Sequence, residues 1–231
     1  MTIAIVLAGG IGSRLGAEIP KAYVEVCGKP LIIYCLETLA ESTFIDGYQI
    51  VADDKWIPEI EEWIRKYELR EKLTGFSKPG TNRQGSIYNG LMDLRGKLKD
   101  EDYVFVHDSA RPLLTTKLVR ESIDGMNGYD GVLPVLPMKD TVYMSKDGKQ
   151  IDSLVNRAEI YAGQAPETFV YGKYLAANQR LVEAGEIETI NGSSEVAVKA
   201  GMRMHLIPGD EMNFKITTMA DLDRFEEILK G

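Results

Sequence analysis

The sequence has few of the residues that build disulfide frameworks and transition-metal centres. Its 231 residues include only two cysteines, Cys27 and Cys35, and two histidines, His107 and His205. Two cysteines form neither a disulfide framework nor a four-cysteine zinc site, and two histidines argue against a histidine-rich metal centre. We therefore expect a protein of a reducing, cytoplasmic compartment, with both cysteines as core residues.

Long apolar runs and an excess of positive charge are also missing. No apolar run approaches the ~20 residues of a membrane-spanning helix, and the start, MTIAIVLAGG, lacks the basic segment of a signal peptide. Lys and Arg number 27 against 35 Asp and Glu, so the net charge of −8 argues against general nucleic-acid binding. The apolar fraction of 44% and the charged fraction of 27% exclude global disorder. The length fits one α/β domain spanning residues 1–231.

Short apolar runs alternate with helical patterns along most of the chain. Strands are predicted at residues 3–7, 48–52, 103–106, 131–136 and 214–217, and helices at residues 30–41, 56–72, 82–94, 116–126, 172–183, 194–199 and 219–230. Thr116 and Thr218 are predicted helix N-caps. The alternation predicts an α/β fold with a doubly wound, mostly parallel, Rossmann-like sheet and right-handed crossovers.

One stretch departs from this alternation. Residues 140–156 have the pattern of strand, turn and strand, with Asp147-Gly148 as the turn. A lone two-stranded hairpin is only marginally stable in water. We therefore expect residues 139–157 to form a protruding arm that rests on a second subunit.

A glycine-rich loop follows the first predicted strand. It reads Leu7-Ala8-Gly9-Gly10-Ile11-Gly12-Ser13-Arg14-Leu15-Gly16 and leads to Pro20-Lys21. Glycines let the backbone approach phosphate, and ligands of doubly wound folds lie beyond the carboxyl ends of strands. The spacing fits neither a Walker loop nor the dinucleotide fingerprint, which makes a dehydrogenase the weakest hypothesis. Arg14 and Lys21 suit attack on a triphosphate; the alternative is a tight turn with two solvated cations.

The run LAGGIGSRLGAEIPK resembles the signature loop of nucleotidyltransferases that join a small phosphate to a nucleotide. Nearly the whole chain is similar to the cytidylyltransferase family that contains the 2-C-methyl-D-erythritol 4-phosphate and ribitol-5-phosphate enzymes. The matching segments, in family order, continue with GTNRQGSIYNGL, VHDSARP, PMKDT, Asn156-Arg157 and NFKIT. The resemblance implies a fold of the nucleotide-diphospho-sugar transferase type. It also implies a Mg²⁺-dependent homodimer that transfers CMP from CTP to a small phosphonate or phosphate acceptor and releases pyrophosphate.

The resemblance assigns roles to the matching residues. It implies catalytic cations at Arg14, Lys21 and Lys215. It implies that the nucleotide is bound by Leu7, Ala8, Gly9, Gly10 and Gly12, by a second, cytosine-reading loop with Gly80, Asn82, Arg83 and Ser86, and by Asp108, which also ligates the metal. It implies that the acceptor is bound by Lys139, Asp140, Thr141, Arg157, Ser194 and Glu195, in part through the arm of the second subunit.

Simpler explanations stay open for several of these residues. Ser86 fits a capped helix, Lys215 an ordinary surface lysine, and Lys139 with Asp140 a solvated pair on an edge strand. We interpret His107 as structural, because the attacking phosphate oxygen is already anionic at pH 7. Arg111 is expected to brace its loop by an ion pair.

Three segments depart from the family pattern. Ala165-Pro166-Glu167 stands where Thr-Pro-Gln is usual, Ser193-Ser194-Glu195 replaces Thr-Asp followed by Glu or Ala, and Asn156-Arg157 replaces Asp-Arg. A lost hydroxyl removes a partner for a substrate hydroxyl, and the acids Asp140, Glu167 and Glu195 would suit a cationic acceptor. The expected acceptor is therefore 2-aminoethylphosphonate, ahead of phosphocholine, with the two polyol phosphates as the alternative. Two further hypotheses are a sugar-phosphate nucleotidyltransferase that uses UTP, GTP or dTTP, and a CTP-binding sensor.

Overall fold

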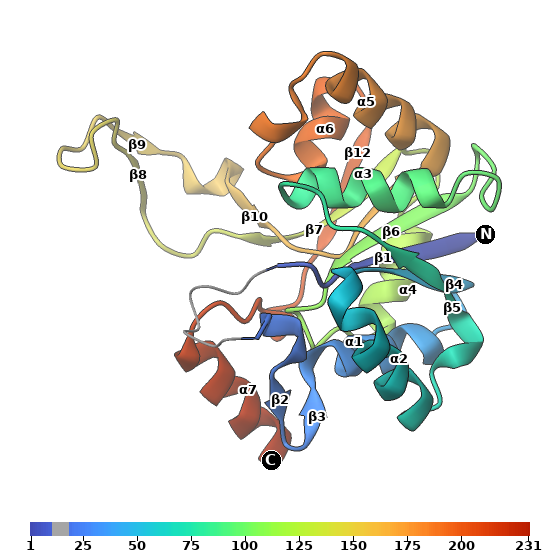
Figure 1. Cartoon of the computed structure of the whole chain (residues 1–231). Helices are drawn as coiled ribbons and strands as arrows, with labels where there is room; N and C mark the ends of the chain where they lie inside the picture. Colours follow the sequence, from blue (N-terminus) through green and yellow to red (C-terminus); the bar gives the residue numbers. More distant parts are fainter. Residues whose placement is uncertain (11–18) are drawn as a thin grey trace.

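The computed structural model describes residues 1–10 and 19–231 and is built around an eight-stranded sheet (Figure 1). Its order is β10-β7-β11-β6-β1-β4-β5, and β12 also pairs with β7. The strands are β1 (Thr2–Leu7), β4 (Gly47–Val51), β5 (Leu73–Ser77), β6 (Tyr103–Asp108), β7 (Gly131–Pro137), β10 (Tyr161–Gly163), β11 (Glu167–Val170) and β12 (Met204–Pro208). Only β10 and β11 run antiparallel to their neighbours. The predicted α/β class with a mostly parallel sheet is confirmed.

Helices cover both faces of this sheet (Figure 1). One face packs against α1 (Leu31–Glu41), α2 (Ile57–Lys66) and α4 (Thr116–Asp124), and the other against α3 (Arg83–Asp93), α5 (Tyr171–Glu183) and α6 (Ser193–Lys199). The last helix, α7 (Met219–Lys230), packs Phe225 against Val26 and Leu31, beside the small pair β2 (Glu25–Val26) and β3 (Lys29–Pro30). Short 3-10 helices are η2 (Lys21–Tyr23), η3 (Asp54–Trp56), η4 (Arg70–Lys72), η5 (Arg157–Glu159) and η6 (Ile187–Thr189).

Strand β1 illustrates why a central strand of this sheet is apolar at successive positions. Successive side chains of a strand point to opposite faces of the sheet. Ile3 and Ile5 join the core under α3 and α5, whereas Ala4 and Val6 join the core over α1 and α4. A strand buried on both faces must be apolar at every position, which is the signal that made this strand predictable.

Several predicted boundaries need correction. The helix predicted at 56–72 ends at Lys66, where the chain turns through Glu68 at a positive φ of 58° into η4 and β5. The N-cap of α4 is Thr115, whose side chain accepts a hydrogen bond from the backbone of Leu118, and not Thr116. The predicted cap Thr218 is confirmed and forms a capping box with Asp221.

The strand predicted at 214–217 is wrong. This segment has no regular secondary structure and does not join the sheet; the amide of Ile216 donates to the carbonyl of Ala110 at 2.8 Å. The sequence also did not reveal β5, β10, β11 and β12. These four strands have three to five residues each, and their strand character depends on pairing with partners far along the chain.

The two cysteines differ from each other. Cys35 is fully buried in α1, as predicted, and burial raises the pKa of its thiol to about 12. Cys27 is exposed in the turn between β2 and β3 at a positive φ of 51°. The prediction that Cys27 is a core residue is therefore wrong, because a tight turn places it outside the packed layers.

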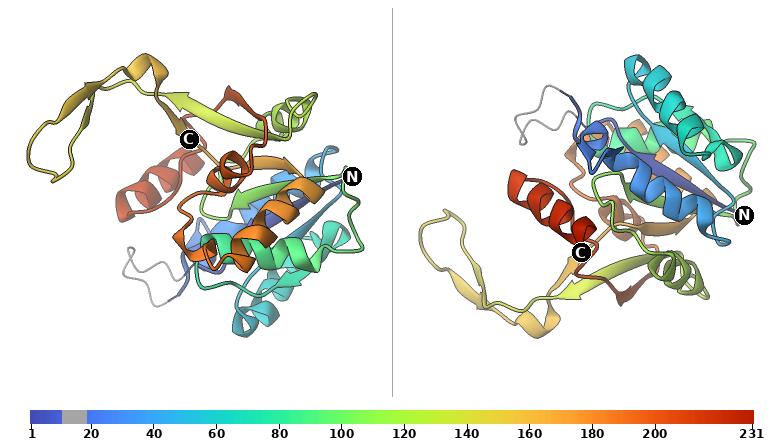
Figure 2. Two further views of the ribbon diagram at one scale, coloured as in Figure 1. Left: turned by 90° about the horizontal axis from the view of Figure 1, so that it is seen from above. Right: turned by 90° about the horizontal axis from the view of Figure 1, so that it is seen from below.

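The predicted hairpin is present and extends away from the sheet (Figures 1 and 2). Strand β8 (Val142–Met144) pairs antiparallel with β9 (Ser153–Val155), and Gly148 in the turn has a φ of 69°. Tyr143, Ile151 and Leu154 are 53%, 66% and 67% exposed, so the arm carries apolar side chains without a partner in the described part of one chain.

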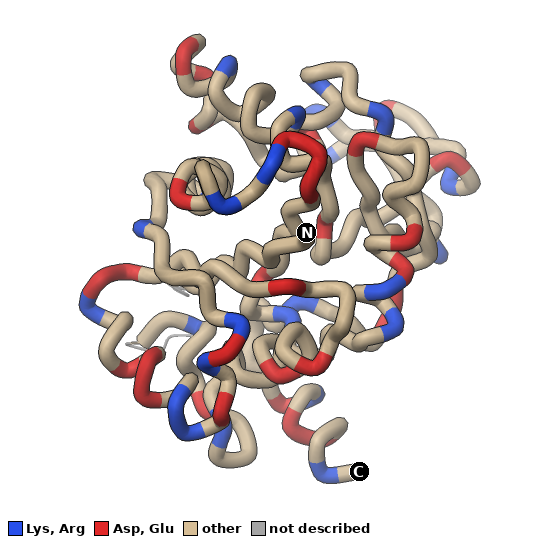
Figure 3. Tube along the Cα trace, turned by 90° about the vertical axis from the view of Figure 1, so that its right-hand side faces the viewer, with Lys and Arg blue, Asp and Glu red and all other residues tan. Residues whose placement is uncertain are grey.

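Acidic and basic residues are interspersed along the trace in Figure 3. The net negative charge is therefore compatible with local positive sites made by a few placed residues. Within residues 1–10 and 19–231, no helix has both the length and the apolar character to cross a membrane.

Candidate active site

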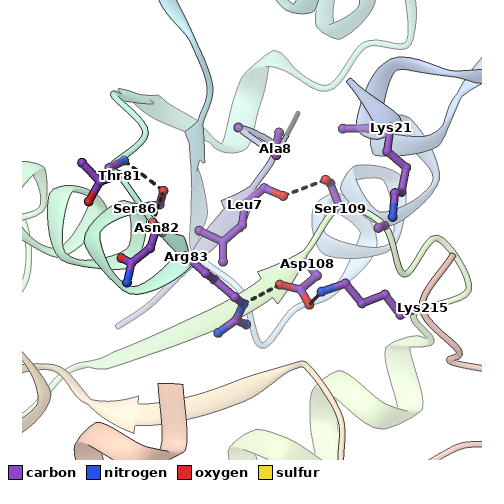
Figure 4. A pocket seen from close by; sticks show the side chains of 15 residues that line it. Leu7, Ala8, Lys21, Thr81, Asn82, Arg83, Ser86, Asp108, Ser109 and Lys215 are labelled. Carbon is purple, nitrogen blue, oxygen red and sulfur yellow. Dashed lines mark hydrogen bonds and ion pairs between the residues drawn. The ribbon is translucent and has the colours of Figure 1, made fainter. Parts of the chain in front are cut away.

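A cavity of about 440 Å³ opens beyond the carboxyl ends of β1 and β6 (Figure 4). Parallel strands that end together leave such a crevice in doubly wound folds. Segments far apart in the sequence line it: Leu7, Ala8, Gly9, Gly10, Lys21, Ala22, Gly80, Thr81, Asn82, Arg83, Ser86, Asp108, Ser109, Ala110 and Lys215. The structure thus brings together the described residues that were predicted for catalysis and nucleotide binding. The predicted residues Gly12 and Arg14 lie outside the described residues.

The start of the first loop is held by backbone and tyrosine contacts. The amide of Ala8 donates to the carbonyl of Val51 at 2.9 Å, and the hydroxyl of Tyr23 donates to the carbonyl of Ala8 at 3.1 Å. Burial, reinforced by Asp53, raises the pKa of Tyr23, so its hydroxyl remains a donor. A Cβ at Gly9 would lie 2.7 Å from the Cβ of Pro79, so only glycine allows the two loops to approach this closely. Tyr23 was not predicted; its only signal was an aromatic residue two positions after Lys21.

The second loop is fixed at the start of α3. Asn82 caps this helix by accepting from the amide of Gly85 at 2.7 Å. Ser86 accepts from the amide of Gly80 at 3.0 Å and donates to the carbonyl of Asn82, so its hydroxyl braces the loop (Figure 4). A Cβ at Gly80 would lie 2.4 Å from the carbonyl carbon of Gly85. A loop held this firmly presents its backbone groups in fixed positions, which selective recognition of a base requires.

Asp108, at the end of β6, lies between two cations (Figure 4). Nε of Arg83 donates to its Oδ1 at 3.0 Å, and Nζ of Lys215 donates to its Oδ2 at 2.8 Å. Burial alone would raise the pKa of Asp108, but Arg83 and Lys215 outweigh this effect and hold the pKa well below its usual range. The carboxylate is therefore ionised throughout the physiological pH range. Lys215 lies in a loop and not on the predicted strand.

Lys21 approaches the same cavity from η2. Its Nζ donates to the carbonyl of Ile216 at 2.8 Å, which links the first loop to the segment that carries Lys215. Ser109, which was not among the predicted site residues, donates to the carbonyl of Leu7 at 2.7 Å and joins the ends of β1 and β6.

His107 and Arg111, on either side of the cavity-lining residues 108–110, contact backbone carbonyls. The ring of His107 is buried, its Nε2 lies 3.1 Å from the carbonyl of Arg111, and burial lowers its pKa to about 4. A neutral, buried ring is consistent with the predicted structural role. Arg111 donates to the carbonyl of Asn213 at 2.6 Å and has no ion pair among the described residues, so the predicted ion pair is wrong. The carbonyl contact supplies the bracing instead.

The structure does not bring the predicted acceptor residues to this cavity. Lys139 pairs with Glu211, and Arg157 donates to the carbonyl of Lys139 at 2.7 Å. Asp140 and Thr141 are exposed near the base of the arm. On α6, Ser194 does not line the cavity, and Glu195 accepts from the amide of Asn191 at 2.9 Å and lies 3.4 Å from Lys199. Their role in binding an acceptor remains a prediction.

Glu167 is buried behind Arg83 and does not line the cavity. Its Oε1 lies 3.6 Å from Nη2 of Arg83 and accepts a hydrogen bond from Ser193. The interpretation of Glu167 as an acid that faces a cationic acceptor is therefore wrong, because its carboxylate already faces an arginine.

Comparisons with known proteins agree with this geometry. The family model described as "IspD: 2-C-methyl-D-erythritol 4-phosphate cytidylyltransferase" matches residues 2–231. The chain is 32% identical over 228 residues to the 2-C-methyl-D-erythritol 4-phosphate cytidylyltransferase of Geotalea uraniireducens (strain Rf4), covering 99% of this chain and 96% of that protein.

Solved structures show the same fold. The 4-diphosphocytidyl-2C-methyl-D-erythritol synthase of Anaerococcus prevotii DSM 20548 superposes with a TM-score of 0.85 at 23% identity, over 100% of this chain and 96% of that one. The 2-C-methyl-D-erythritol 4-phosphate cytidylyltransferase of Francisella tularensis gives 0.82 at 21% identity, over 98% of both chains. Together with the match along the whole sequence, these findings show that the chain belongs to the 2-C-methyl-D-erythritol 4-phosphate cytidylyltransferase family and is a CTP-dependent nucleotidyltransferase.

Proposed function

We propose that the protein transfers CMP from CTP to 2-C-methyl-D-erythritol 4-phosphate and releases pyrophosphate. The observation that carries the proposal is the arrangement of Asp108 between Arg83 and Lys215, in a cavity bordered by two tightly packed glycine-containing loops. Fixed cations and backbone amides in such a cavity suit a bound triphosphate.

The proposed reaction needs positioned charge more than proton transfer. An oxygen of the acceptor phosphate attacks the α-phosphorus of CTP, the new P–O bond forms, and the bond to the bridging oxygen of pyrophosphate breaks. The attacking oxygen is already anionic, so no general base is required. This agrees with the burial of His107, the histidine nearest to Asp108 in the sequence. Lys21 and Lys215 would stabilise the negative charge that develops around the α-phosphorus.

The donor set fits a magnesium ion that is held mainly by substrate. Among the described residues, no group of three or more acidic, histidine or cysteine side chains could hold a metal by itself. Magnesium commonly uses one or two carboxylates together with phosphate oxygens. Asp108 would supply the carboxylate, and the ion would neutralise charge on the phosphates of CTP.

The structure offers no support for 2-aminoethylphosphonate as the acceptor. Glu167 faces Arg83, Glu195 faces Lys199 and the amide of Asn191, and Asp140 is exposed near the base of the arm. None of the three predicted acids lines the cavity of this chain. The name of the 32% identical relative and the description of the matching family favour the methylerythritol phosphate, which was the alternative.

Pyrophosphate release tests this proposal directly. The enzyme is incubated with CTP, Mg²⁺ and one acceptor at a time: 2-C-methyl-D-erythritol 4-phosphate, ribitol 5-phosphate, 2-aminoethylphosphonate or phosphocholine. We expect kcat/KM for the first acceptor to exceed that for the amines by at least about 10³-fold, because a site built for substrate hydroxyls rejects analogues that lack them. Faster turnover of either amine would overturn the choice of acceptor. CTP binding without turnover of any acceptor would support the sensor.

We further propose that the protein is a cytoplasmic homodimer in which the arm, residues 139–157, completes the acceptor site of the partner. The exposed apolar side chains of the arm and the absence of Arg157 from the cavity of its own chain support this proposal. A two-fold dimer would exchange two identical arms.

Mixing two inactive variants tests whether the arm acts in the partner. Arg157→Ala removes the arm's contribution, and Lys21→Ala disables the cavity of its own chain. After the subunits exchange at equal concentrations, random pairing makes about half of the dimers mixed. In a mixed dimer, the intact cavity of the Arg157→Ala chain receives the intact arm of the Lys21→Ala chain, and the other site lacks both. We therefore expect about a quarter of wild-type activity. Activity no higher than that of the separate variants, with subunit exchange verified by mass spectrometry, would contradict action in the partner.

A further inference from the structure

Glu167, Arg83, Asp108 and Lys215 form a row of alternating charges that begins in the core and ends in the cavity. Asp108 contacts both Arg83 and Lys215, and Arg83 also faces Glu167 across 3.6 Å. Arg83 and Lys215 line the cavity, whereas Glu167 lies behind them and is only 6% exposed. With all four groups ionised, the row has two negative and two positive charges and is neutral as a whole. Burial raises the pKa of Glu167, and the contacts with Arg83 and Ser193 oppose this effect.

Glu167 owes its position to the sheet and to Ser193. It is the first residue of β11 and pairs with Val106, two residues before Asp108 in the adjacent strand. Ser193 donates its hydroxyl to Oε1 of Glu167 and accepts from Nη1 of Arg83 at 2.7 Å, so one hydroxyl bridges the acid and the guanidinium. Oε2 of Glu167 is buried and has no hydrogen-bond partner among the described residues. The charge of this carboxylate is therefore balanced chiefly by Arg83.

The position of Arg83 in its own helix is electrostatically unfavourable for a positive charge. Arg83 is the first residue of α3, and the N-terminus of a helix carries partial positive charge. Two carboxylates compensate for this placement. A phosphate that enters the cavity must compete with both of them for the guanidinium.

We propose that Glu167 is a positioning residue that holds Arg83 by charge and thereby lowers the affinity of the cavity for polyphosphate. The inference rests on the proposed function in so far as the cavity binds a triphosphate. With the neutral side chain of Gln at position 167, the row would carry one net positive charge, and Asp108 would be the only carboxylate paired with Arg83.

The variant Glu167→Gln tests the charge with little change of shape. Glutamine can still accept the hydrogen bond from Ser193, so we expect the fold to persist, which circular dichroism verifies. Calorimetric titration without acceptor should show CTP and inorganic tripolyphosphate binding roughly tenfold more tightly than to wild type at low salt, with a steeper salt dependence. Glu167→Asp, which keeps the charge, should stay within about threefold of wild type.

Glu183→Gln is the matched control. Glu183 is exposed on α5, so this change alters the net charge equally but leaves the cavity unchanged. Equal affinities of Glu167→Gln and Glu183→Gln for tripolyphosphate, or weaker binding by Glu167→Gln, would overturn the inference. A wild-type protein that binds tripolyphosphate but does not prefer CTP over other nucleoside triphosphates would instead count against the proposed function, so the two failures are distinguishable.

Discussion

Replacing Lys21 with alanine should reduce turnover of CTP by at least about 10²-fold while the protein remains folded. The expected size corresponds to the removal of one preorganised donor from a site where charge develops in the transition state. Lys21 lies on the cavity wall and is held there by its hydrogen bond to the carbonyl of Ile216. Single-turnover measurements at saturating CTP would separate this loss from weaker nucleotide binding.

Two controls distinguish loss of the Lys21 charge from loss of its packing. Lys21→Met keeps an unbranched apolar stem and should be as inactive as Lys21→Ala. Lys117→Ala removes a 73% exposed lysine of α4 and should change turnover by less than about twofold. Near-normal turnover in folded Lys21→Ala protein would remove Lys21 from the mechanism.

The parts of the fold that could be predicted are those whose signal is local. The run from Ile3 to Leu7 is apolar throughout because both of its faces are buried, and α7 has a threonine cap immediately before it. Strand β11 has only four residues, of which Glu167 and Thr168 are polar. Its place in the middle of the sheet follows from pairing with β6 and β7, which no local pattern expresses.

The same distinction applies to the site. The two loops and Asp108 are contiguous motifs that can be recognised in the sequence, and the structure brings them together in one cavity. Tyr23 acts through a hydrogen bond to the backbone of Ala8, and no motif marks it. Ser193 lies in a segment that the family pattern marks, but its contacts with Arg83 and Glu167 join residues distant in sequence and were not predicted. Glu167 was misinterpreted for a related reason. The sequence alone does not distinguish an acid that faces a substrate from an acid that is buried behind an arginine; the distance to Arg83 and the burial of Glu167 do.

Replacing Asp108 with asparagine should reduce turnover by about 10²- to 10³-fold and also lower stability. The change keeps the shape of the side chain but removes the negative charge between Arg83 and Lys215. Because both cations are partly exposed, we expect the free energy of unfolding at pH 7 to fall by only about 1–3 kcal/mol. If Asp108 holds the metal, the Mg²⁺ concentration for half-maximal activity should rise as well.

The pH dependence of the free energy of unfolding tests independently whether the ionised carboxylate of Asp108 stabilises the fold. The pKa of Asp108 is lower in the folded chain than the ~3.9 of an unfolded aspartate, so its ionised form stabilises the fold above that pH. This contribution is lost as the pH falls below about 4, towards the lower pKa of the folded state. The stability difference between wild type and Asp108→Asn should therefore be fully present at pH 6 and shrink below about pH 4.

Asp130→Asn separates the loss of stability from the loss of chemistry. Asp130 is also an ion-paired aspartate with a lowered pKa, bound by Lys173 at 2.6 Å, but it lies outside the cavity. This variant should be less stable but should keep its turnover. The Asp130 carboxylate links the start of β7 to α5 through Lys173 and does not line the cavity in which the phosphates would bind. Equal activity of Asp108→Asn and Asp130→Asn at the same Mg²⁺ concentration would contradict a catalytic role of Asp108. Its carboxylate would then serve only the structural ion pairs with Arg83 and Lys215.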